Sequence, residues 1–352
     1  MQHRAADCGG HWLALKLSSA AANLPADFAA RKGAGVMTTS ADRPQPAVLD
    51  AAAFGALYRR LRDASRWGPA DRRGALNHIT PQQVLAAVTE IRLGRTVTMA
   101  SPLESQVALD NPEPAIHQMT SPPGDQADPA GLSFATDRLA TNIHGDADSH
   151  LDALCHVIYH ASLYNGVPAD TITSTGAAEL SVEVARDGIA GRGVLLDIPR
   201  LRGMSWLEPG DHVTADDLMA AEQAQQVRVG QGDLLFVRVG HRRRRAELGP
   251  WDAASSRAGL HPAALEFVAE RRVAVLGSDS NNDTTASLAE GVDYPVHVLA
   301  VHAMGVHLLD YLQFEDLVPL CQEAGRWSFF CVIAPLRLVG GTGSPVNPIA
   351  IL

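Results

Sequence analysis

The stretch NIHGDADSHLDALCHVIYH, residues 142–160, holds four of the 14 histidines of the 352-residue chain, together with three aspartates. Within it, His150, Asp152 and His156 have the spacing H-x-D-x-x-x-H. Residues two apart on an extended segment point to one side, so His150 and Asp152 are placed to bind a common ion. A helical turn after Asp152 would return His156 to the same pocket. Imidazole and carboxylate suit Zn²⁺ or Mn²⁺, so the spacing predicts a divalent metal site.

A third ligand has two candidates in the same stretch. Asp146 lies four residues before His150, and His144 competes with it. The simpler alternative is a surface loop whose histidines have ordinary polar partners or bind metal only adventitiously. Several partly buried imidazoles beside carboxylates are costly to keep without a shared partner, so the density of the stretch favours a metal site. Cys155 has no His-Asn arrangement around it that would make it a nucleophile.

Composition excludes several classes of function. The formal net charge of -10 argues against a nucleic-acid groove or an anionic-membrane surface, which need clustered Lys and Arg. The one basic run, HRRRR at 241–245, is interpreted as a solvated loop. No apolar stretch approaches the roughly 18 residues of a transmembrane helix. Four cysteines without a CxxC pair indicate reduced thiols. We therefore expect a cytoplasmic protein with no nucleic-acid or membrane partner.

The hydrophobic pattern predicts a single α/β domain over residues 47–352. Residues 1–46 are rich in Ala, Gly, Ser and Pro, so we expect them to be peripheral or disordered, and Met37 is a candidate start of translation. Apolar periodicity, capping residues and glycine boundaries indicate alternating helices and strands with a mixed sheet. The expected helices are 80–94, 214–226, 261–270, 297–305 and one from Glu315. The expected strands are 95–103, 191–201, 232–240, 273–280, 327–340 and 347–352, and residues 306–312 are expected to form a strand or a turn.

Several segments resemble one family in the same order. SHLDALCH resembles the T-H-x-D-A-x-x-H core of the cyclase family, which includes bacterial kynurenine formamidases and isatin hydrolase. The segment at 66–87 is similar to the W-G-x-x-D-x-x-G-x-x-N motif of the family. YNG at 164–166, GDLLFVRVG at 232–240, VAVLGSDS at 273–280 and GGTGSPVNPIAIL at 340–352 also match it in order.

The resemblance implies a swivelling β/β/α fold and one or two divalent ions, Zn or Mn. His150 and Asp152 fall on the H-x-D ligands, and His156 falls on the acid-base residue. The first family His falls on Asp146, so the ligand has changed to a carboxylate or moved to His144.

The resemblance also places residues outside the motif. Distal ligand positions of the family fall on His297 and Asp310, where Asp in place of Glu implies a weakened or absent second metal. Trp67 matches a family position near the substrate, although a buried core Trp fits equally well. His302 and His307 are interpreted as structural residues with backbone or water partners.

The resemblance implies hydrolysis of a small cyclic or N-acyl amide, or of a lactone. The ion would lower the pKa of a bound water to about 7, and the resulting hydroxide would attack while His156 moves the proton. We expect a homodimer or homotetramer acting on a small molecule. Two alternatives stay open, namely a metal-using cyclase or lyase of a secondary-metabolite pathway and a catalytically silent metal- or ligand-binding protein.

Overall fold

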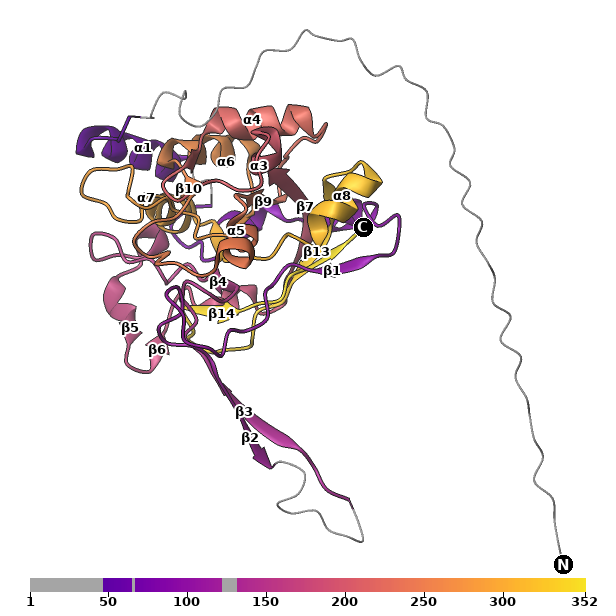
Figure 1. Cartoon of the computed structure of the whole chain (residues 1–352). Coiled ribbons are helices and arrows are strands. Elements are labelled where there is room, and N and C mark those ends of the chain that lie inside the picture. The colour runs from indigo at the N-terminus through magenta and orange to yellow at the C-terminus, as the bar shows by residue number, and fades with distance from the viewer. Residues whose placement is uncertain (1–46, 65–66, 122–131) are drawn as a thin grey trace, which may run out of the picture. The chain divides into compact units, whose positions relative to one another are not determined.

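A computed structural model describes residues 47–64, 67–121 and 132–352 (Figure 1). The predictions for residues 1–46, including Met37, lie outside these described residues. From residue 47 onward, the described residues belong to one compact unit. None of their helices has the length and apolar character that a bilayer-spanning helix needs.

A nine-stranded mixed sheet forms the centre of this unit, in the order β1-β15-β13-β7-β9-β11-β12-β4-β14. The four strands β7, β9, β11 and β12 run parallel to one another, and antiparallel strands extend the sheet on both sides. The strand bounds are β1 Thr96–Thr98, β4 His150–Asp152, β7 Ile189–Asp197, β9 Leu234–Arg238, β11 Val275–Ser278, β12 His307–Asp310, β13 Ser328–Ile333, β14 Gly343–Pro345 and β15 Ile349–Ile351. The predicted α/β fold with a mixed sheet is confirmed.

Helices pack against this sheet and against one another. The bounds are α1 Ala51–Asp63, α2 Pro81–Val88, α3 Ile198–Leu201, α4 Ala215–Ala224, α5 His241–Leu248, α6 Leu265–Arg271, α7 Pro295–His297, the π-helix Val298–Met304 and α8 Leu317–Ala324. Capping boxes begin two of the predicted helices, at Thr80 with Gln83 and at Thr214 with Asp217. Helices α1, α4 and α6 lie together in Figure 1, and the contacts of α6 with both neighbours agree with that view.

The basic run at 241–245 corrects one prediction, because it forms most of helix α5 instead of a solvated loop. Arg242 is buried and donates to the backbone carbonyls of Ala147 and Tyr311. Arg245 pairs with Asp110 at 2.5 Å. These partners come from distant parts of the chain, so the local composition could not predict that Arg242 is buried.

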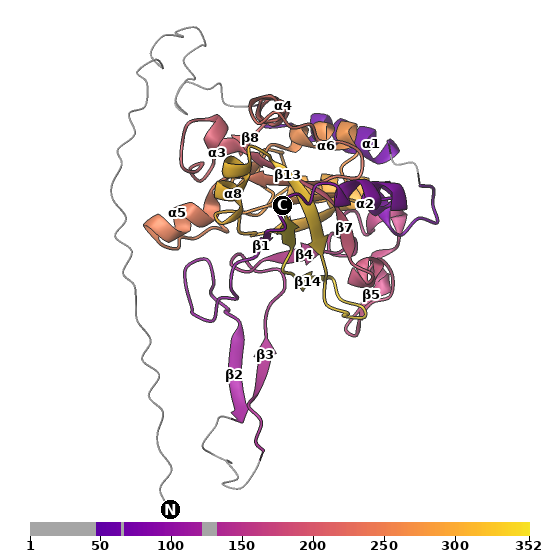
Figure 2. The same ribbon diagram turned by 90° about the vertical axis from the view of Figure 1, so that its right-hand side faces the viewer.

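Strands β2 Ile116–Ser121 and β3 Thr136–Ala140 form a separate hairpin that extends away from the large sheet in both views (Figures 1 and 2). Almost every side chain in these strands is exposed. Three of the exposed side chains are large and apolar, namely Ile116, Met119 and Leu139. The chain that follows β3 runs directly into the histidine-rich stretch at 142–160, so the hairpin adjoins the predicted metal site. Two short strand pairs complete the sheets, β8 His212–Val213 with β10 Gly259–Leu260 and β5 Ile172–Thr173 with β6 Gly176–Ala177.

Candidate metal centre

Strand β4 carries the H-x-D pair into the interior of the large sheet. It pairs antiparallel with β12 on one side and with β14 on the other, and Asp310 of β12 lies directly opposite His150. Side chains two apart on a strand point to the same face, which places His150 and Asp152 together as the spacing predicts. All three side chains are buried. The chain then returns through a turn, and not through the expected helix, to His156.

His297 joins this face from the end of α7. Its Nε2 lies 3.3 Å from Oδ2 of Asp152 and 3.4 Å from Oδ2 of Asp310. Nε2 of His150 lies 3.7 Å from Oδ1 of Asp152. Four side chains from three separate segments of the chain thus converge, and ligand atoms of His150, Asp152 and Asp310 all lie within 4.8 Å of one another.

A second group of donors shares Asp152. His144 Nδ1 lies 2.8 Å from Oδ1 of Asp152, and the His144 ring stacks on His156 with centroids 3.7 Å apart. Ligand atoms of His144, Asp152 and His156 also lie within 4.8 Å of one another. Burial disfavours the ionised form of Asp152, but the surrounding His156, His144 and His297 outweigh it and hold the pKa of this carboxyl well below its usual value. Asp152 is therefore an ionised acceptor at the point where the two groups meet.

Three residues that the sequence did not single out hold the distal ligands in place. Asp283 accepts from Nδ1 of His297 at 2.6 Å, so Nε2 is the ring nitrogen that faces Asp152 and Asp310. The amide nitrogens of Asn281 and Asn282 both donate to the carboxylate of Asp310. The only sequence signal for these residues is the polar run SDSNND that follows the buried strand β11.

Asp146 lies beside this centre in a different arrangement. The Tyr311 hydroxyl donates to Oδ1 of Asp146 at 2.6 Å. Asp146 belongs to neither three-residue group found among the described residues, whereas His144 belongs to one. Both side chains line the same cavity as the other donors. Of the two candidates for the further ligand, His144 therefore contacts Asp152 directly, and Asp146 is oriented by the buried Tyr311.

The donor set fits a divalent cation. It combines buried histidine imidazoles with carboxylates, and these are ligand types that Zn²⁺ and Mn²⁺ accept. Oδ2 of Asp152 is buried and forms no hydrogen bond among the described residues, and its one ion-pair contact there is Nε2 of His297 at 3.3 Å. A buried carboxylate oxygen without a hydrogen bond is costly, and a cation in contact with it would remove that cost. His150, Asp152, His297 and Asp310 are the residues placed to hold such an ion.

A cavity of about 540 Å³ opens directly onto these donors. Its polar lining includes His156 and Asn281, and its apolar lining includes Val157, Ile158 and Val292. A volume of this size lies within the range of pockets that bind small molecules. Substrate entering the cavity would therefore meet the donor groups and His156 together.

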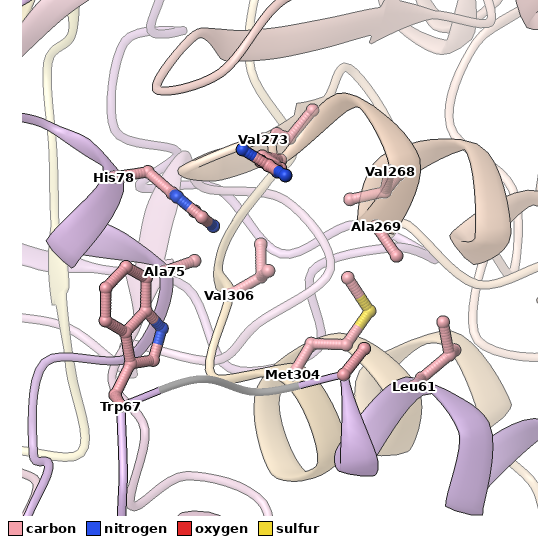
Figure 3. A pocket seen from close by; sticks show the side chains of 11 residues that line it. Leu61, Trp67, Ala75, His78, Val268, Ala269, Val273, Met304 and Val306 are labelled. Carbon is pink, nitrogen blue, oxygen red and sulfur yellow. The ribbon is translucent and has the colours of Figure 1, made fainter.

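Trp67 lines another cavity, together with Leu61, His78, Met304 and Val306 (Figure 3). Its ring meets His78 edge-on, with centroids 5.0 Å apart. Trp67 is not among the residues that line the cavity beside the metal ligands. Among the predicted site residues, it is the one that the structure does not bring to this centre.

His302, Cys155 and His307 lie outside the donor groups. Nε2 of His302 donates to the carbonyl of Ser162 at 3.1 Å, as a structural histidine with a backbone partner would. Burial raises the pKa of Cys155 to about 12, so it is not a reactive thiolate. His307 is completely buried, and burial lowers its pKa to about 4. Neither ring nitrogen of His307 has a hydrogen-bond partner among the described residues.

We expect Tyr58→Phe to lower the free energy of unfolding by about 1 kcal/mol, as for a typical single hydrogen bond. Since Nε2 of His302 donates to Ser162, its Nδ1 accepts from the Tyr58 hydroxyl at 2.9 Å. The variant keeps the ring and removes only that donor. Urea denaturation measures the difference, and an unchanged free energy of unfolding would show that this hydrogen bond contributes nothing to stability.

Comparisons with known proteins place this geometry in a family. Residues 107–282, half of the chain, match the Cyclase family model. The crystal structure of a novel cyclase is 31% identical, with 84% of this chain and 99% of that chain covered and a TM-score of 0.74. No curated protein matches the chain.

Two isatin hydrolase structures are more distant. One, bound to the product analogue thioisatinate, is 20% identical over 78% of this chain and 99% of that chain, with a TM-score of 0.51. The other, isatin hydrolase A from Ralstonia solanacearum, is 24% identical over 77% of this chain and 97% of that chain, with a TM-score of 0.53. At these identities they show a common fold. The family match and the 31% identical structure confirm the predicted resemblance, and the chain belongs to the cyclase family.

Proposed function

We propose that the chain is a metal-dependent hydrolase of a small cyclic or N-acyl amide, or of a lactone. The observation that carries this proposal is the convergence of His150, Asp152, His297 and Asp310 beside a cavity large enough for a small molecule. The shared fold with isatin hydrolases supports it as an analogy of fold.

Each residue has a distinct part in this proposal. The four converging side chains would hold one divalent ion, Zn or Mn, with Asp146 or His144 as a further ligand. A bound ion supplies Lewis acidity toward a carbonyl oxygen and lowers the pKa of water. Asp283 fixes the His297 ring, and the two asparagines fix Asp310. His156 lines the cavity and is placed to carry a proton to the leaving nitrogen or oxygen.

The number of ions depends on the second donor group. Because Asp152 belongs to both groups, its two oxygens could each face an ion, with His144 and His156 holding the second one. The stacking of His144 on His156 instead favours a single ion with His156 kept for proton transfer. Counting ions per chain separates these arrangements.

Hydrolysis is tested against its two rivals by product analysis. The panel contains N-formyl anilines, isatin and lactones, each incubated with and without a chelator. Cleavage that the chelator stops supports the proposal. A carbon-carbon or elimination product would support a metal-using cyclase or lyase instead. Metal binding without any product would support a silent family member.

We expect the purified protein to contain about one equivalent of Zn or Mn per chain, because a structural or catalytic ion is bound tightly by such donors. His150→Ala should lose it, since this buried imidazole lies at the centre of one donor group. Elemental analysis measures both. An unsubstituted protein without first-row metal after metal-replete expression would overturn the proposal.

We also propose that the chain forms a homodimer or homotetramer. A two-stranded hairpin is marginally stable in isolation, and β2 and β3 expose apolar side chains on a segment that extends from the large sheet. A second copy of the chain would cover them. Light scattering should give two or four times the mass of one chain, which is 37.4 kDa. The mass of a single chain would contradict this. A cytoplasmic location stays a prediction.

A further inference from the structure

Tyr294 forms an aromatic wall of the cavity beside the metal ligands. It precedes α7 directly, and 47% of its surface is exposed. Its ring meets the His297 imidazole edge-on, with centroids 5.8 Å apart and an interplanar angle of 74°. The Tyr294 ring therefore lies next to a metal ligand while keeping free surface toward the cavity that it lines.

The Arg257 guanidinium fixes this ring from the protein side. Its central carbon lies 5.4 Å from the ring centroid, and the residue is only 1% exposed. Nε donates to the carbonyl of Asp283, and Nη1 donates to that of Ala253. Among the described residues, no carboxylate forms an ion pair with Arg257. A buried guanidinium held by backbone groups is rigid, and its cation–π contact orders the Tyr294 ring before any ligand binds.

The rest of the cavity lining combines apolar side chains with histidines, aspartates, Tyr159 and Asn281. Val157, Ile158, Val292 and Val298 supply apolar surface. The charged lining residues are histidines and four aspartates, and the described lining contains no Lys or Arg. An ion held by Asp152 and Asp310 would offset their charge, but exposed Asp293 beside Tyr294 keeps its own. A ligand carboxylate that lies beside Asp293 and away from the ion would therefore meet repulsion that no Lys or Arg of the described lining offsets.

We propose that Tyr294 is a specificity residue that packs against an aromatic ring of an uncharged substrate, while Asp293 disfavours substrates that carry a carboxylate. This inference rests on the proposed hydrolase function and names the class of amide or lactone that the site would accept. The ring of Tyr294 supplies the contact, and its hydroxyl is not required.

The ring contact is tested by binding of benzamide and cyclohexanecarboxamide, which differ in the aromatic ring. Ligand-observed NMR titration is applied to the metal-free and the zinc-loaded protein. We expect Tyr294→Leu to weaken benzamide binding about 2- to 10-fold, the range of an aromatic pair beyond its buried area. Binding of cyclohexanecarboxamide should change less than binding of benzamide. Tyr294→Phe is the matched control and should bind benzamide like the unsubstituted chain.

The charge effect is tested with 4-carboxybenzamide, which adds one carboxylate to benzamide. We expect it to bind several-fold more weakly than benzamide at low salt, with the difference shrinking as salt screens the charges. Asp293→Asn should reduce the difference in binding, because it removes the exposed charge and keeps the size of the side chain. This residue is exposed, so the variant is expected to fold normally.

Two results would overturn the inference. One is that Tyr294→Leu weakens the binding of benzamide and of cyclohexanecarboxamide equally, or weakens neither. The other is 4-carboxybenzamide binding as tightly as benzamide, with no response to Asp293→Asn. Binding is measured in the metal-free protein as well, so a failure of hydrolysis across the substrate panel would reject the proposed function without hiding either result.

Discussion

Asp152→Asn is expected to abolish both metal binding and turnover. Asp152 belongs to both donor groups, and its oxygens lie 2.8 Å from His144, 3.7 Å from His150 and 3.3 Å from His297. Asn has nearly the same size, so the variant removes the negative charge with little change in packing. Altering a residue that only supports a ligand costs about 10- to 100-fold in metal affinity. Losing the shared ligand should cost more, leaving almost no metal and only background hydrolysis.

Asp148→Asn is the matched control for this variant. Asp148 is a buried carboxyl in the same stretch, and its Oδ1 accepts from the backbone nitrogen of Glu104. It belongs to neither donor group of the described residues. Asn keeps the size of the side chain and an oxygen that can accept the same hydrogen bond, so the replacement is a mild change. We expect metal content and turnover to persist. Equal loss of metal in both variants would show that the loop, and not the ligand, had failed.

Local patterns predicted the elements that depend on short-range chemistry. The capping residues Thr80 and Thr214 begin helices as expected, because a cap depends only on residues within one turn. The H-x-D spacing predicted a shared face for His150 and Asp152, because alternation is a property of any strand. Apolar runs also predicted the buried strands β7 and β9, but β7 begins at Ile189, before Gly191, and residues 198–201 form helix α3 instead of continuing the strand.

Features that depend on long-range contacts were not accessible from local patterns. The positions of His297 and Asp310 came from the family resemblance alone, since no spacing rule connects residues so far apart. Asp283 reaches His297 only because β11 and β12 are neighbours in the sheet and the chain between them folds back over the site. The burial of Arg242 has the same origin, because its acceptors lie on other elements.

His156→Ala is expected to keep the metal and to lower turnover about 10²- to 10⁴-fold, the usual contribution of a general acid or base. The side chain follows β4 through a turn and lines the cavity. Its imidazole is not in the group formed by His150, Asp152 and Asp310. Turnover is measured on whichever panel compound is cleaved, and metal is measured by elemental analysis. His156→Gln, which keeps more of the volume, should show the same loss of turnover.

His160→Ala is the control, because His160 is an exposed imidazole in the same loop and is not among the residues that line the cavity. It should retain both metal and rate. Loss of metal in His156→Ala as complete as in Asp152→Asn would make His156 a ligand and favour the arrangement in which His144, Asp152 and His156 hold an ion. Full turnover in His156→Ala would assign the proton to another group. His144 is then the candidate for proton transfer, because its ring stacks on His156 and its Nδ1 lies 2.8 Å from Asp152.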